Sequence, residues 1–218
     1  MSRAVKRPNK KAALREDSIQ RLSDAAFQVF VTKGYHASTL QEIAESVGLT
    51  KGAIFFYFAS KQKLLLHLLE IAEANIVDSL FSHLAGIRGN ALDKLVGYYH
   101  FGSMHGIKRP YQLLCLIQTS IEFRHRADPI GKRIVAIYSR IYRVLEEVIE
   151  KGKTSGVLAK TVATREFASM MIATHDGMML EWWRRGKNQI DGRILVETVR
   201  DTMLYGIAAE SMRPGKAR

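Results

Sequence analysis

The stretch that most constrains the fold of this chain is residues 38–66, STLQEIAESVGLTKGAIFFYFASKQKLLL. It predicts two short helices separated by a tight turn and followed by the start of a longer helix. Thr39 can cap the first helix, and it forms a capping-box pattern with Glu42. Gly48 ends that helix, because glycine adopts the left-handed conformation without steric cost. Thr50 can then cap the second helix.

The second of these helices, from Lys51 to about Tyr57, opens with a cationic side chain and then two small residues, Gly52 and Ala53. Free N–H groups and a lysine at a helix N-terminus attract anions. Small side chains let another surface approach the backbone closely. A helix that enters the major groove of DNA needs both properties, so the stretch predicts a helix-turn-helix.

The composition favours a polyanionic partner and a reducing compartment. The 218 residues carry a formal net charge of +12, and 47% of them are hydrophobic, enough for a sizeable core. Cys115 is the single cysteine, so an internal disulfide is impossible. The basic N-terminus lacks the apolar run of a secretory signal, and no apolar run is long enough to span a bilayer. We expect a cytoplasmic protein that does not contact a membrane.

The order of these signals predicts three regions. Residues 1–14 form a basic N-terminal arm, which is either a solvated tail or a segment that reaches the phosphates or minor groove of DNA. Residues 15–62 form the helix-turn-helix domain, whose first helix we expect to begin at Asp17 or Ser18. Residues 63–218 form a ligand-binding and dimerisation domain.

Helical spacing continues to the C-terminus, and we find no alternating run typical of a strand. Glycine, proline and aspartate residues separate further helices, at about residues 61–84, 91–107, 111–125, 129–153, 164–185 and 190–209. The predicted fold class is therefore all-α, with about nine helices. An N-terminal three-helix bundle contains the helix-turn-helix, and a C-terminal helical bundle follows it.

Residues 25–69 resemble the DNA-binding domain of TetR-type transcriptional regulators. The positions that carry the resemblance, in order, are Phe30, Gly34, Tyr35, Thr39, Ile43, Ala44, Gly48, Leu49, Thr50, Gly52, Ile54, Phe58, Ser60, Lys61, Leu64 and Leu65. The resemblance implies an all-helical homodimer with a DNA-reading domain and a variable domain that usually holds a small-molecule pocket. Phe55 departs from the pattern, because the family usually has a tyrosine there whose hydroxyl contacts phosphate.

The residues expected to contact DNA lie at the starts of the two short helices and along the second one. Lys51 donates either to a guanine edge or only to phosphate, and both alternatives stay open. Ser38 and Lys61 are among the expected phosphate contacts. Phe55 and Phe56 cannot both be buried in so small a bundle. The full set is Ser38, Thr39, Gln41, Thr50, Lys51, Gly52, Ala53, Phe55, Phe56, Tyr57 and Lys61.

Aromatic and sulfur-containing side chains in the C-terminal half are either plain core or, in part, the lining of a ligand pocket. The expected effector is small and apolar or aromatic, with His105 or His175 as a polar contact. We expect the side chains of His175 and its neighbour Asp176 to diverge. The predicted pocket residues are Tyr99, Met104, His105, Phe123, His175 and Met178.

The last two predicted helices share an apolar face, which suggests a surface for a second copy of the chain. Two helices from each subunit would form a four-helix bundle, and two reading domains would then meet successive major grooves of a near-palindromic operator. The predicted dimerisation residues are Phe167, Met171, Thr174, Trp182, Ile194, Thr198 and Met203.

Neither a metal site nor a catalytic site is expected. The histidines show no metal-ligand spacing, and Cys115 lies in an apolar run where a buried, inert thiol is the default. No cofactor is predicted. The expected function is a repressor released from double-stranded operator DNA by its effector. The alternatives are a DNA-binding activator or architectural protein without an effector, and a small-molecule carrier or enzyme that uses the helical pocket.

Overall fold

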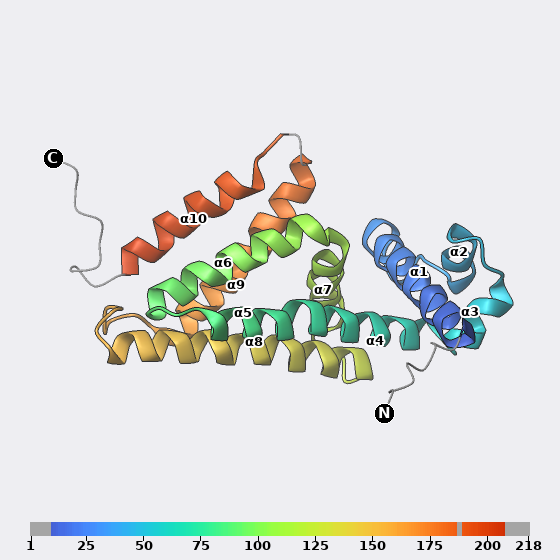
Figure 1. The fold of residues 1–218 in the computed structure, drawn as a ribbon, viewed down its shortest axis with the longest axis horizontal. Helices are drawn as coiled ribbons and strands as arrows, with labels where there is room; N and C mark the ends of the chain where they lie inside the picture. Colours follow the sequence, from blue (N-terminus) through green and yellow to red (C-terminus); the bar gives the residue numbers. More distant parts are fainter. Residues whose placement is uncertain (1–9, 187–188, 208–218) are drawn as a thin grey trace, which may run out of the picture. The chain divides into compact units, whose positions relative to one another are not determined.

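The computed structural model describes residues 10–186 and 189–207, and the predicted arm therefore lies largely outside the described residues. The helices are α1 (Lys10–Lys33), α2 (Leu40–Ser46), α3 (Lys51–Tyr57), α4 (Lys61–Ala72), the π-helical segment η1 (Glu73–Asp78), α5 (Ser79–Gly86), α6 (Ala91–Lys108), α7 (Pro110–Phe123), α8 (Pro129–Thr154), α9 (Thr164–Arg185) and α10 (Gly192–Ile207). Since α4, η1 and α5 are continuous, the described residues form nine helical segments and no strand, which confirms the predicted fold class (Figure 1).

The chain divides into two compact units, one ending at Leu69 and the other beginning at Glu70. We had placed the domain boundary after residue 62. The N-terminal unit extends further because the first turns of α4 supply Leu64, Leu65 and Leu68 to its core, each at most 1% exposed.

The core of the N-terminal unit is built where α1, α2 and α3 meet. Leu22 of α1, Ile43 of α2 and Ile54 of α3 are all fully buried. Helix α1 begins at Lys10, earlier than we expected, because the residues from Lys10 to Leu14 are strong helix formers that need no tertiary support to continue the helix.

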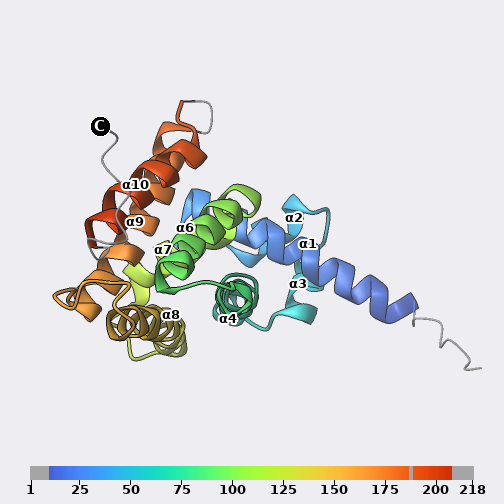
Figure 2. The same cartoon turned by 60° about the vertical axis from the view of Figure 1, so that its left-hand side comes forward.

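Helix α8 organises the C-terminal unit. Its apolar positions recur at helical spacing, and Ile134, Ile137 and Leu145 are at most 1% exposed. Helices α6, α7 and α9 pack against it, and α10 packs on α6, as Figures 1 and 2 both show.

The π-helical segment η1 was not predicted. The Ser79 hydroxyl donates to the carbonyl oxygen of Ala74 at 3.2 Å, across five residues instead of the usual four. Glu73 pairs with Arg133 at 2.5 Å and with Arg140, which also donates to Asp78 at 2.6 Å. Ion pairs with α8 therefore hold both ends of this segment. Such segments are frequent at functional sites.

Candidate functional site

The turn between α2 and α3 is set by local hydrogen bonds. The Thr39 hydroxyl oxygen accepts from the Glu42 N–H at 3.1 Å, and that of Thr50 accepts from the Ala53 N–H at 3.2 Å. Gly48 has φ +71°, and the N–H of Leu49 reaches back to Ala44 at 2.9 Å. Both predicted N-caps and the predicted glycine C-cap are confirmed.

Helix α3 buries one face and exposes the other. Ile54 is fully buried and Phe58, just past the helix end, is 7% exposed, whereas Phe55 and Phe56 are 47% and 74% exposed. Large aromatic side chains rarely stay in water without a partner surface. Phe55 and Phe56 therefore form an exposed aromatic pair on the outward face of α3, which begins at the cationic side chain of Lys51.

Gly52 has no role in the packing of its own subunit. A Cβ atom at this position would meet only the Thr50 hydroxyl oxygen, 3.9 Å away. Glycine in the first turns of a helix costs about 1 kcal/mol relative to alanine. Because nothing among the described residues of the N-terminal unit requires a glycine here, its lack of a side chain favours close approach by an external surface.

Two of the predicted phosphate contacts have internal partners. Ser38 is 2% exposed, and its hydroxyl donates to the carbonyl oxygen of Tyr35 at 2.8 Å. The ammonium group of Lys61 donates to the carbonyl oxygens of Tyr35, His36 and Ser38 at 2.6, 3.2 and 2.8 Å. The loop before α2 has carbonyl groups without helical partners, and these two side chains satisfy them. Ser38 thus offers no hydroxyl to DNA.

The other predicted DNA contacts lie at the surface of the N-terminal unit. Thr39, Gln41 and Thr50 are exposed, while Ala53 and Tyr57 are partly exposed. The Gln41 amide donates to the Glu45 carboxylate at 2.9 Å, a bond across one exposed helical turn that a DNA contact could replace.

The sequence did not reveal the role of Arg21, a residue of α1 that binds the C-terminal end of α2. The Arg21 guanidinium donates to the carbonyl oxygen of Val47, at the C-terminus of α2, at 2.6 Å. Lys33 pairs with Glu42 at 2.6 Å, and this hydrogen bond is the main cause that lowers the pKa of the Glu42 carboxyl. Basic side chains suit helix C-termini, but only the folded structure pairs residues this far apart in sequence.

The C-terminal unit contains two hollows between its helices. The outer hollow, partly open to solvent, is lined by Gly102, Ser103, Gly106, Ile107, Leu113, His175, Met178, Met179, Trp182, Gly192, Leu195 and Val196. The inner hollow is lined by Ile76, Leu80, Tyr98, Phe101, Gly102, His105, Leu113, Leu116, Tyr138, Ile141, Ile172, His175 and Asp176.

A small polar group interrupts the apolar lining of the inner hollow. The Tyr138 hydroxyl donates to the Asp176 carboxylate at 3.4 Å, and Nδ1 of His175 lies 3.5 Å from the same carboxylate. Contrary to our expectation, the adjacent His175 and Asp176 side chains converge. Burial, then the charges of Arg109 and His175, lower the pKa of His105 to about 4, so this imidazole is neutral at pH 7.

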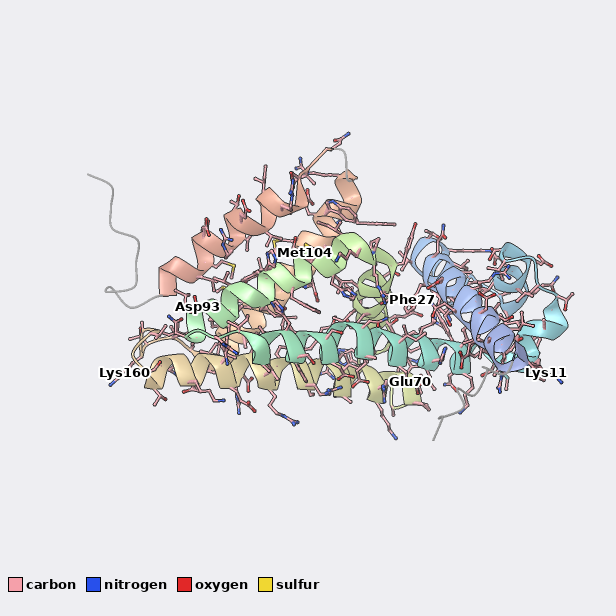
Figure 3. All side chains as sticks on the ribbon, viewed as in Figure 1. Lys11, Phe27, Glu70, Asp93, Met104 and Lys160 are labelled. Atoms are coloured by element: carbon pink, nitrogen blue, oxygen red, sulfur yellow. The ribbon has the colours of Figure 1, made fainter. Side chains whose placement is uncertain are left out.

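The structure gathers His105, His175 and Met178 at the hollows and keeps the other predicted pocket residues away from them. Tyr99 is fully buried, and its hydroxyl donates to the sulfur of Met203 at 3.5 Å. Phe123, 2% exposed, packs under the guanidinium of Arg126, whose Cζ lies 4.8 Å from the ring centroid. Met104 lies on the outer side of α6 and is 41% exposed (Figure 3).

The predicted dimerisation residues are divided between the core and the surface. Phe167 and Met171 are buried within their own subunit, because the apolar face of α9 packs on α8. The Thr174 hydroxyl donates to Met170, Trp182 lines the outer hollow, and Met203 accepts from Tyr99. Ile194, 61% exposed, and Thr198 are exposed on α10, and Met170 and Trp183 are exposed on α9.

Within the described ranges, no three histidine, cysteine, aspartate or glutamate side chains gather closely enough to hold a metal ion. The same residues include no helix that is both long and apolar enough to cross a bilayer.

A capped helix-turn-helix followed by an all-helical domain with internal hollows defines the class of helix-turn-helix transcriptional regulators. The family model described as bacterial regulatory proteins of the tetR family matches residues 22–68, and the model described as the C-terminal region of YsiA-like proteins matches residues 88–206. The chain belongs to the TetR family and is a TetR-type transcriptional regulator.

Several relatives match across most of the chain. The crystal structure of the MbdR regulator from Azoarcus sp. CIB is 38% identical, with a TM-score of 0.80 over 87% of this chain and 98% of that one. The fatty acid metabolism regulator protein of Bacillus subtilis is 25% identical over 161 residues, 73% of this chain and 80% of the relative. The transcriptional repressor BepR of Brucella suis is 24% identical over 204 residues, 87% of this chain and 91% of the relative.

Proposed function

We propose that this regulator is a repressor that binds a near-palindromic operator as a homodimer. The observation that carries the proposal is the exposed face of α3, where Lys51, Gly52 and two aromatic rings face outward from a helix whose other side is fully buried. The ammonium group of Lys51 and the absence of a side chain at Gly52 suit the electronegative major groove. The exposed rings can contact thymine methyl groups or sugars.

Dimerisation through α9 and α10 would set the spacing between the two reading domains. Support comes from the exposed apolar side chains Met170, Trp183 and Ile194 on these two helices. A two-fold dimer pairs the same surface of both subunits, and the operator mirrors its symmetry.

The proposed effector is a small apolar or aromatic molecule held in the hollows of the C-terminal unit. The apolar lining and the few convergent polar groups support this choice. Binding would favour a conformation with a lower affinity for the operator.

A thioester of coenzyme A is a second form of effector that the lining supports. The outer hollow shares Ile107, Trp182 and Gly192 with an open groove lined also by Tyr111 and Trp183, whose rings would suit a head group that carries a ring. Arg193 also lines this groove, where it pairs with Asp191 at 3.7 Å. The FadR regulator of Bacillus subtilis, 22% identical to this chain, has been solved in complex with stearoyl-CoA.

A mobility-shift titration with the DNA that flanks the protein's own gene tests the proposal. We expect a saturable shift at moderate salt, a protected site with two-fold symmetry, and release by a small apolar or aromatic molecule or by a coenzyme A thioester. No specific shift at any salt concentration would contradict the repressor function. A specific shift that no effector reverses, combined with activation of the adjacent promoter, would favour a DNA-binding activator.

A further inference from the structure

The two hollows of the C-terminal unit are neighbours that share part of one wall. Gly102 of α6, Leu113 of α7 and His175 of α9 line both of them. Of these side chains, the imidazole of His175 is the polar one, and contacts with Gly102, Asp176 and Tyr98 fix its position.

Gly102 provides the surface on which the imidazole lies. A Cβ atom at this position would overlap the Nε2 end of the His175 ring, so any larger residue would displace that ring. On its other side, Nδ1 of His175 lies 3.5 Å from the Asp176 carboxylate, and the ring centroid of Tyr98 lies 5.7 Å away. The ring therefore occupies one defined position at the shared wall, and its side chain is 12% exposed.

We propose that the His175 ring divides one elongated cavity into the outer and inner hollows and thereby limits the length of ligand that the protein accepts. The proposal rests on the proposed effector function, and it deepens that function by naming the residue that determines ligand length. Without the imidazole we expect the two hollows to join, because Gly102 contributes no side chain and only Leu113 remains of the shared lining.

The chemistry of the inner hollow narrows the class of ligand. Its polar groups are the Asp176 carboxylate, the hydroxyls of Tyr98 and Tyr138, and the imidazoles of His175 and His105. The buried Nε2 of His105 has no hydrogen-bond partner among the described residues. A carboxylate repels an anionic group and accepts from a neutral donor. The inner hollow therefore suits an unbranched apolar chain that ends in a neutral hydroxyl or a similar donor.

Straight-chain primary alcohols of 4 to 14 carbons are suitable probes, measured by displacement of the fluorescent ligand N-phenyl-1-naphthylamine from the full-length protein. Each methylene that enters an apolar cavity should tighten binding about fourfold, until the cavity is full. In the wild type, we expect this gain to stop at a chain length set by one hollow. In His175→Ala, the gain should continue for several more carbons.

His175→Phe is the matched control, because an aromatic ring keeps the division without the contact between Nδ1 and the Asp176 carboxylate. Wild-type chain-length limits in His175→Phe together with a longer limit in His175→Ala support the proposal. The same limit in His175→Ala and in the wild type overturns it, as does an absence of alcohol binding in both. Operator binding without alcohol is measured in the same samples, because its loss would contradict the repressor function and not the division of the cavity.

If His175→Ala does not fold, as judged by circular dichroism, a crystal structure of the wild type with 1-dodecanol decides. An alkyl chain confined to one hollow, with the His175 ring still lying on Gly102, supports the proposal. A chain that passes through both hollows while the ring keeps its position overturns it.

Discussion

The ammonium group of Lys61 lies 4.5 Å from the ring centroid of Tyr35 and donates a hydrogen bond to the carbonyl oxygen of the same residue at 2.6 Å. The start of α4 is thereby joined to the loop that precedes the helix-turn-helix. We had expected this lysine on a DNA phosphate. Its internal partners make it a residue that stabilises the N-terminal unit.

Lys61→Met should therefore lower the stability of the folded protein and leave its DNA contacts unchanged. The free energy of unfolding is expected to fall by about 1–3 kcal/mol, because loop carbonyl groups lose a charged donor. Thermal unfolding measures this change, and Lys63→Met, at an exposed position of the same helix, is the control. The dependence of operator affinity on salt should keep its wild-type slope. An unchanged unfolding midpoint with a slope reduced by about 1 would show instead that Lys61 contacts phosphate.

Glu73 should matter for the C-terminal unit, because its carboxylate is 12% exposed and lies between Arg133 and Arg140. Glu73→Gln leaves two guanidinium groups beside a neutral amide, and we expect a loss of about 1–3 kcal/mol in denaturant unfolding. Glu147→Gln, at an exposed position on α8, is the matched control and should change stability by less than about 0.5 kcal/mol. Equal effects of the two substitutions would contradict a stabilising role for this ion cluster.

The Cys115 thiol should be almost inert in the folded protein. It is 2% exposed, and burial raises its pKa to about 12, against a smaller opposing effect of the hydrogen bond with Thr119. Because the thiolate is the reactive form, modification by a disulfide reagent at pH 8 should be at least about a hundredfold slower than in the unfolded chain. Similar rates in the two states would mean that α7 opens readily.

Lowering the pH should destabilise the protein, in part because His105 binds a proton more readily in the unfolded state. Its folded pKa of about 4 lies below the ordinary value of 6.5, so the unfolded state binds the proton more readily. Stability due to this residue is present above pH 6.5 and is lost as the pH falls toward 4. The expected loss is on the order of 1 kcal/mol after solvent screening.

His105→Asn should reduce the slope of unfolding free energy against pH between pH 6.5 and 4. His100→Asn, at an exposed position on the same helix, should leave the curve unchanged. A wild-type slope between pH 6.5 and 4 in His105→Asn would rule out His105 as the group responsible.

Features that depend on residues close together in sequence were predicted correctly. Thr39, Thr50 and Gly48 act within a few residues of themselves, so their types alone indicate the helix starts and the turn. The burial of Ile54 follows in the same way from the spacing of apolar residues along α3.

Features that depend on contacts between residues far apart in the chain could not be predicted from the sequence. The carbonyl groups that engage Lys61 lie more than twenty residues before it, and nothing local marks them as lacking helical partners. Likewise, Gly102 and His175 meet only because α6 and α9 pack together.

The most direct test of the central claim is the affinity of Lys51→Ala for its operator, measured by fluorescence anisotropy over a range of salt concentrations. If α3 lies in the major groove, affinity should fall by at least about tenfold, either with relaxed sequence preference or with a salt slope reduced by about 1. Lys160→Ala removes the same charge from an exposed position in the C-terminal unit and should bind like the wild type. Wild-type affinity and wild-type sequence preference in Lys51→Ala would contradict the account.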